Sequence, residues 1–273
     1  MAGRDFFIGT AGWSIASRYR QDFPEAGTHL QRYGGRLRAV EINSSFYRPH
    51  RRETYARWAD AVPAGFRFSA KLPKTITHEH RLKDCRALLD GFFEQAGGLG
   101  EKLGVVLVQL PPSLRFEAPA AESFLGELRQ RTEAGLALEP RHASWFGVEI
   151  EALLRRFRVA RVAADPPPHP TASEPGGSPH LAYFRLHGSP RIYYSAYDDR
   201  ALAAIAARLE RSRAAGAETW CIFDNTAEGH ALQNALHVDA AVDGGAAAAK
   251  RGAPQPDQIT FNSRKGRPSA TRS

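Results

Sequence analysis

The sequence has few cysteines: two among 273 residues. Cys85 and Cys221 lie far apart, each in an apolar stretch. This usage excludes a disulfide framework and a CxxC metal site. A chain of this length buries roughly three-quarters of its unfolded surface, so a hydrophobic core can form without such cross-links.

Long apolar runs are also missing. No stretch of 18 consecutive apolar residues occurs, and Met1–Asp5 lacks the apolar region of a secretion signal. A membrane-spanning helix needs about 20 apolar residues, and a signal peptide needs an apolar segment of its own. We therefore expect a cytoplasmic protein with no membrane partner, whose oligomeric state the sequence does not indicate.

Nucleotide and metalloprotease fingerprints are absent as well. Neither GxGxxG nor GxxxxGK[ST] follows a strand-like segment, which argues against a nucleotide-binding fold. The compact zinc motif HExxH is also missing. A divalent metal held by scattered carboxylates and histidines stays open, and no other cofactor is indicated.

The net charge is +8, and residues 241–273 carry half of it, with six basic and two acidic side chains. This segment is rich in Ala, Gly, Pro and Ser, so we expect a disordered basic tail. A basic tail adds electrostatic affinity for a polyanion. A non-catalytic protein that binds nucleic acid through this tail and the rim of the predicted barrel is therefore one alternative, and a merely solvated tail is the other.

Short β-rich segments recur along the body at intervals of roughly 30 residues, the size of a βα unit. We expect eight strands: Phe6–Gly9, Leu37–Asn43, Phe66–Lys71, Gly104–Leu110, Leu136–Arg141, Val159–Asp165, Leu181–His187 and Thr219–Asn225. Helical patterns lie between them: Thr54–Ala61, Leu82–Gly97, Pro119–Arg131, Val148–Phe157, Asp199–Ala214 and Ala227–Val238.

The stretch Pro166–Pro179 holds six prolines and predicts an irregular loop in place of a helix after the sixth strand. Eight such units in a chain of this length favour a closed barrel over an open sheet. We predict an α/β protein with one (β/α)₈ TIM barrel over residues 1–240, followed by the disordered basic tail over 241–273.

Polar side chains gather at the last residues of these strands. Side chains alternate between the two faces of a strand, so Glu41 and Asn43 face away from Val40 and Ile42. The same alternation places Ser69 with Lys71, Glu139 with Arg141, and Tyr183 with Arg185 and His187. A barrel with its active site at the C-terminal rim produces this gradient.

The predicted ring has balanced charges and several neutral partners. Its members are Glu41, Glu139, Asp165, Asp224, Lys71, Arg141, Arg185, His78, His142, His187, Asn43, Gln109 and Asn225. Loop aromatics, among them Trp13, Phe46, Tyr47, Trp145 and Tyr193, surround it. They either stack on a ligand or pack beneath the loops.

Four interpretations of the ring stay open. Lys71, Arg141 and Arg185 would bind a phosphate or carboxylate beside a general acid or base. Carboxylates with His187 would hold a divalent metal that activates water. Lys71 would form a Schiff base, or the ring would be an ion-pair network that plugs the barrel.

Eight ordered motifs give the sequence a family resemblance over roughly residues 6 to 240. They are Gly9–Ser14, Val40–Tyr47, Phe66–Lys71, Ile76–His78, Gln109–Pro112, Glu139–Trp145, Arg185–Gly188 and Phe223–Thr226. This set resembles the YecE-like family, a domain of unknown function, and implies a TIM barrel without an established activity. Pro140 stands where the family usually has an aromatic residue, and Asp224 where asparagine is common.

The resemblance and the alternation together predict a site at the C-terminal rim for a small anionic ligand bearing phosphate or carboxylate. If the protein is an enzyme, we expect a metal- or acid/base-assisted hydrolase, of the phosphoester type, or an isomerase. Glu41, Glu139 and His187 are the predicted catalytic residues. The predicted substrate-binding residues are Asn43, Lys71, His78, Gln109, Arg141, His142, Trp145, Arg185 and Asn225.

Overall fold

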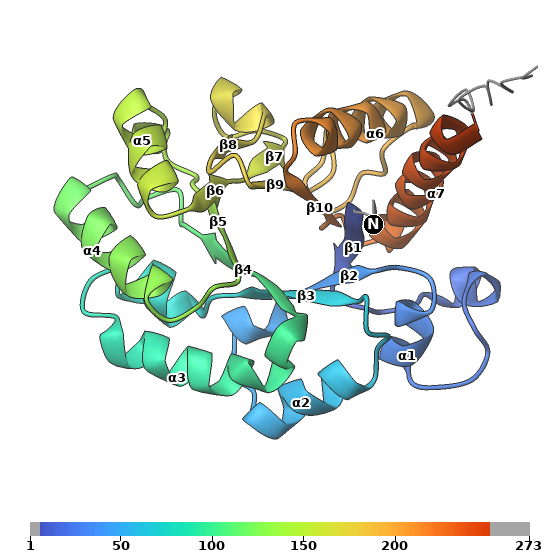
Figure 1. Cartoon of the computed structure of the whole chain (residues 1–273), viewed down its shortest axis with the longest axis horizontal. Helices are drawn as coiled ribbons and strands as arrows, with labels where there is room; N and C mark the ends of the chain where they lie inside the picture. Colours follow the sequence, from blue (N-terminus) through green and yellow to red (C-terminus); the bar gives the residue numbers. More distant parts are fainter. Residues whose placement is uncertain (1–5, 252–273) are drawn as a thin grey trace, which may run out of the picture.

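The computed structural model describes residues 6–251 of the chain and the side chains of residues 6–242. Nine short parallel strands form the wall of a barrel, and helices form a layer around it (Figure 1). The strands are β1 (Phe6–Ala11), β2 (Ala39–Ile42), β3 (Arg67–Lys71), β4 (Leu103–Gln109), β5 (Gly135–Glu139), β6 (Val159–Arg161), β7 (Ala163–Asp165), β9 (Leu181–Leu186) and β10 (Glu218–Phe223).

The sheet runs in the order β7-β9-β10-β1-β2-β3-β4-β5-β6, and chain continuity closes it. Only Val162 separates β6 from β7, so these two strands are halves of one barrel strand that changes partner. β6 pairs with β5, and β7 pairs with β9. The barrel therefore has eight strand positions, as the sequence predicts. A further short strand, β8 (Gly176–Gly177), pairs antiparallel with β6 outside the barrel wall.

Seven α-helices accompany the strands within the part of the chain that the structure describes. They are α1 (His29–Gly34), α2 (Arg52–Asp60), α3 (Arg86–Ala96), α4 (Ala118–Arg129), α5 (Val148–Arg156), α6 (Asp199–Ala214) and α7 (His230–Arg251). Short 3₁₀ segments cover Ser17–Asp22, Ser44–Phe46, Gly97–Lys102, Ala143–Trp145 and Pro170–Ser173, and a π-helical turn covers Thr75–Glu79.

The helices begin and end where local chemistry favours it. The Asp198 side chain caps α6 by accepting a hydrogen bond from the Ala201 amide at 2.8 Å. In α5, Ile150 and Leu154 are buried four residues apart and form the face toward the strands. Its acidic residues lie in the first turn and its arginines in the last, which matches the helix dipole.

Two hydrophobic cores result from the alternation of the strands. The outer core lies between strands and helices and includes Val40 and Ile42. The inner core fills the barrel, where Ala39, Val105 and Tyr183 are among its buried members. Because the inner core ends below the C-terminal strand ends, the predicted polar ring lies directly above an apolar filling.

The predicted helices and the loop over residues 166–179 are present, with ends shifted by up to four residues except at the C-terminal end of the last helix. The short helix α1 escaped sequence analysis because its six residues carry little apolar pattern. The helix α7 continues past the predicted boundary at residue 240 to Arg251, and the division into a barrel and a tail stays a prediction. The expected disorder beyond residue 251 lies outside the described residues.

Within residues 6–251, no helix is both long and apolar enough to span a bilayer. The cytoplasmic location stays a prediction.

Candidate functional site: a charged network in the barrel mouth

The barrel strands deliver charged side chains to one end of the inner core. Glu41 lies one residue before the end of β2, while Lys71 ends β3 and Glu139 ends β5. Asp224 follows β10 directly, and its amide donates to the Leu186 carbonyl at 2.7 Å. Strand hydrogen bonding therefore fixes the backbone on which these side chains stand.

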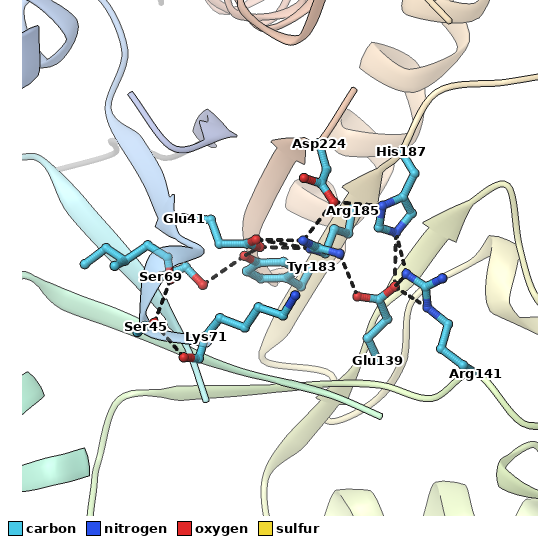
Figure 2. A network of polar contacts seen from close by, with 11 residues as sticks. Glu41, Ser45, Ser69, Lys71, Glu139, Arg141, Tyr183, Arg185, His187 and Asp224 are labelled. Carbon is cyan, nitrogen blue, oxygen red and sulfur yellow. Dashed lines mark hydrogen bonds and ion pairs between the residues drawn. The ribbon is translucent and has the colours of Figure 1, made fainter. Parts of the chain in front are cut away.

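Arg185 is the centre of this network (Figure 2). Its guanidinium is only 1% exposed and contacts three carboxylates. Nη2 lies 2.8 Å from Glu41 Oε1 and 2.9 Å from Asp224 Oδ2, and Nη1 lies 3.2 Å from Glu139 Oε2. Nε adds a contact of 3.0 Å to Glu41 Oε2. With Glu41 bound by both oxygens, Arg185 has little donor capacity left for a ligand.

Tyr183 lies beneath Arg185 and joins the polar layer to the inner core. Its hydroxyl lies 3.1 Å from Glu41 Oε2 and 2.9 Å from Ser69 Oγ. Its ring stacks on Trp220 with centroids 6.0 Å apart. Burial and the Glu41 charge raise the pKa of Tyr183 well above its usual value, so the hydroxyl keeps its proton.

A second cluster joins His187, Arg141 and Glu139. His187 Nδ1 lies 3.1 Å from Asp224 Oδ2, and Nε2 lies 3.0 Å from Glu139 Oε1. Arg141 Nε donates to the same Glu139 oxygen at 2.8 Å, while Arg141 Nη2 lies 3.1 Å from His187 Nε2. Because Arg141 only donates, this last contact and the Glu139 contact compete for one ring nitrogen.

The buried carboxylates remain ionised because of their cations. Burial opposes ionisation of Glu139, but attraction from Arg185 and Arg141 outweighs it and holds the pKa well below its usual range. The same balance of burial against Arg185, helped by His187, lowers the pKa of Asp224. The network therefore holds its negative charges at neutral pH.

Lys71 differs from the other cations. Its side chain is 5% exposed, yet among the described residues no hydrogen bond or ion pair reaches Nζ. The amine lies over the ring of Phe46, 4.2 Å from the centroid. Burial and repulsion from Arg185 lower the pKa of Lys71 to about 8, against the attraction of the three carboxylates.

His78 lies beside the same aromatic ring. Its imidazole meets Phe46 edge-to-face, with centroids 5.0 Å apart, and its Nδ1 lies 2.8 Å from Thr77 Oγ1. Burial and the charge of Lys71 lower the pKa of His78, so the ring is neutral at pH 7. Phe46 therefore joins an amine and a neutral imidazole at the mouth of the barrel.

Two predicted polar residues complete the rim without a charge. Gln109 ends β4 in register with Glu139 and is partly buried. Asn43 follows β2, and its side-chain oxygen is buried without a hydrogen-bond partner in the described structure. Asn43 thus has acceptor capacity that the chain itself does not use.

With the barrel and its network described, comparison with known proteins places the chain. A family model described as "Protein of unknown function DUF72" matches residues 7–258. The chain belongs to the DUF72 family. The resemblance to YecE-like proteins is thereby confirmed. The UPF0759 protein YecE of Escherichia coli K12 is 31% identical over 168 residues, 59% of this chain and 60% of that protein. The chain thus matches less than two thirds of the length of this relative.

Solved structures of the DUF72 family share the fold. A DUF72 family protein of Thermotoga maritima is 26% identical with a TM-score of 0.72, covering 88% of this chain and all of that one. One from Enterococcus faecalis is 21% identical with a TM-score of 0.73, covering 88% of this chain and 96% of that one. These matches confirm the barrel, and the family description assigns no activity.

Several predicted site residues of this DUF72 barrel lie away from the network. Trp145 is buried against Phe116, and its Nε1 donates to the Leu114 carbonyl at 3.0 Å. His142 caps the turn Ala143–Trp145 by accepting from the Ser144 amide. The structure gives these two side chains packing and capping contacts, and their ligand-binding role stays untested.

Two further predicted ring members differ: Asn225 ties two elements together, whereas Asp165 lies outside the ring. Asn225 Nδ2 donates to the Ser195 carbonyl and to Asn234 Oδ1, both at 2.9 Å, so it ties the β9 loop to α7. The expected place of Asp165 in the ring is wrong. It lies two residues after Ala163, which packs in the outer core, and strand alternation turns it toward the helices.

Two residues of the DUF72 network, Ser69 and Tyr193, make contacts that the sequence does not indicate. Ser69 was placed beside Lys71 by alternation, but its bond to Tyr183 depends on a strand 114 residues away. Tyr193 lies edge-to-face against His187, with centroids 5.8 Å apart, on a backbone with positive φ. Nothing in the sequence signals that conformation.

The described residues hold no group of three or more His, Cys, Asp or Glu side chains arranged to bind a metal ion. The carboxylates of the mouth face arginines and His187 instead.

Proposed function

We propose that the protein binds a small anionic ligand, bearing phosphate or carboxylate, at the C-terminal rim of the barrel through Lys71. One observation carries the proposal: the Lys71 residue is only 5% exposed, and its Nζ has no anionic partner among the described residues. Burying a charge without a partner costs several kcal/mol. An anion bound beside Lys71 would remove that cost.

Arg141 is the second ligand contact in this proposal. Its side chain is 17% exposed, and its contacts to Glu139 and His187 use Nε and Nη2, so no described residue occupies Nη1, which can donate to a ligand. Arg185, in contrast, is not a ligand contact in this proposal, because its guanidinium already binds three carboxylates. The ligand contacts therefore narrow to Lys71 and Arg141.

Two of the expected catalytic residues, Glu41 and Glu139, hold the arginines of the mouth in place. Glu41 binds Arg185 with both oxygens, and Glu139 contacts Arg185, Arg141 and His187. If the ligand is hydrolysed or isomerised, His187 is the acid/base group, and its Nε2 would exchange the contact with Glu139 or Arg141 for a contact with the ligand. No metal enters the proposal.

The test measures binding of inorganic phosphate, glycerol 3-phosphate and acetate by calorimetry and by thermal unfolding. A ligand at 100 times its Kd should stabilise the folded protein by about 2.7 kcal/mol. We expect Lys71→Met to weaken the affinity at least about tenfold, a loss of roughly 1.4 kcal/mol. Lys83→Met is the control, since Lys83 is 54% exposed and pairs with Glu117. Equal affinities in both variants would contradict the proposal.

A further inference from the structure

The backbone of Lys71 is held in a fixed position. The Ser45 hydroxyl donates to the Lys71 carbonyl at 2.7 Å, and β3 pairs with β4 at Leu107. Figure 2 shows the extended side chain pointing into the space between Arg185 and Glu139. A lysine held in this way presents its nitrogen, with no competing carboxylate contact, to whatever occupies the mouth.

Some neighbours of this nitrogen favour the neutral amine, and others favour a positive charge. Burial and Arg185 favour the neutral amine, so with a pKa of about 8 roughly a tenth of the molecules carry it at pH 7. Glu41, Glu139 and Asp224 attract positive charge at the same point, and the Phe46 ring face does so as well. A nucleophilic lysine needs the first property, and a protonated imine needs the second.

We propose that Lys71 Nζ forms an imine with an aldehyde or ketone group of the anionic ligand. This inference rests on the proposed function and adds the ligand class, a carbonyl compound with a carboxylate or phosphate. Nζ bonds to the carbonyl carbon, and the two hydrogens of the amine leave with the carbonyl oxygen as water. The imine nitrogen then takes up one proton, and nothing is oxidised or reduced.

His78 is the group placed to move the protons. It shares the Phe46 ring with Lys71 and is neutral at pH 7, so it accepts a proton from the attacking nitrogen and returns one to the leaving oxygen. Arg141 then binds the anionic end of the ligand. In this arrangement Lys71, Phe46, His78 and Arg141 all serve the formation of the imine.

The experiment traps the imine with cyanoborohydride and maps the adduct by peptide mass spectrometry. Glyoxylate is the probe, and glycolaldehyde is the matched carbonyl without an anionic group. We expect glyoxylate to modify Lys71 at least roughly tenfold faster than Lys74, Lys83 or Lys102, because burial and Arg185 lower the pKa of the Lys71 amine. The rate should rise with pH and level off above about pH 8. Glycolaldehyde should react more slowly at Lys71.

Two variants separate this inference from the proposed function. Lys71→Arg keeps a cation that binds anions but is not a nucleophile, so acetate should still stabilise it while trapping elsewhere is unchanged. His78→Gln should slow trapping without weakening acetate binding. If acetate stabilises the wild type but Lys71 reacts no faster than Lys83, the imine is overturned and the anion site stands. If no anion stabilises the wild type, the proposed function fails.

Discussion

Two buried cations in the mouth have opposite relations to the stability of the folded state. Arg185 is a buried cation surrounded by three carboxylates, so its charge is compensated. Lys71 is a buried cation without such a partner, so the folded state is less stable for having it. A residue that lowers stability at a strand end is a candidate for function, since structure alone does not require it.

Replacing Lys71 with methionine should stabilise the protein at pH 7. The pKa of Lys71 falls from 10.5 in the unfolded chain to about 8 in the folded one, so the folded state binds its proton less tightly. This penalty is complete below pH 8, on the order of 3 kcal/mol, and disappears as the pH rises toward 10.5.

Urea unfolding of wild type and Lys71→Met at pH 7 and pH 10 measures the effect. We expect the variant to be more stable at pH 7 by about 1 to 3 kcal/mol, with the difference shrinking at pH 10. Lys83→Met should change stability by less than about 0.5 kcal/mol at either pH. A destabilised Lys71→Met at pH 7 would show that the amine is paired in solution.

Replacing Arg185 with methionine should have the opposite effect. It leaves Glu41, Glu139 and Asp224 buried without their shared cation, which costs about 3 to 5 kcal/mol when one partner of a buried pair is removed. Arg86→Met is the control, because Arg86 is 74% exposed in its pair with Glu127 and should cost under about 1 kcal/mol. Urea unfolding compares them, and similar losses would contradict a central role for Arg185.

At the scale of elements, the contact between β1 and β2 depends on a glycine. A Cβ on Gly9 would lie 1.9 Å from the Ala39 carbonyl oxygen. Gly9→Ala should therefore destabilise the protein by about 3 kcal/mol or more, because the two strands must separate. Gly91→Ala, in α3 with open space around it, should instead stabilise by roughly 0.5 to 1 kcal/mol. Thermal unfolding of both variants tests this, and equal midpoints would refute the close contact.

The elements were predictable because strand alternation is local. The pairing of Glu139 with Arg141 and of Tyr183 with Arg185 on inner faces follows from a period of two. The contacts of Arg185 were not predictable, since Glu41 lies 144 residues away and barrel closure alone brings them together. For the same reason, the sequence predicts Arg185 as a ligand-binding residue and does not distinguish Lys71 as the unpaired cation.

For the molecule as a whole, changing the charges of the basic tail tests the alternative that the protein binds nucleic acid. Its six basic residues should supply most of any affinity for single-stranded DNA, and the salt slope should fall by about 0.7 for each phosphate that is no longer neutralised. Titrations between low and physiological salt would compare wild type, a variant with those six changed to glutamine, and Lys71→Met. We expect a smaller slope only in the tail variant. A reduced slope in Lys71→Met would instead place nucleic acid at the barrel mouth.

The change of partner at Val162 gives the barrel wall one break in its hydrogen bonding. Every other barrel strand is bonded to a neighbour on each side, but the sixth is bonded to β5 over its first half and to β9 over its second. The wall is therefore a rolled sheet with a seam, where the sixth strand is bonded to one neighbour at a time. Arg141 follows β5 and His187 follows β9. Their contacts with each other and with Glu139 therefore connect the two strands on either side of the seam. A ligand that draws Arg141 toward itself would weaken these contacts. Ligand binding at the mouth would then change how firmly β5 and β9 are connected across the seam.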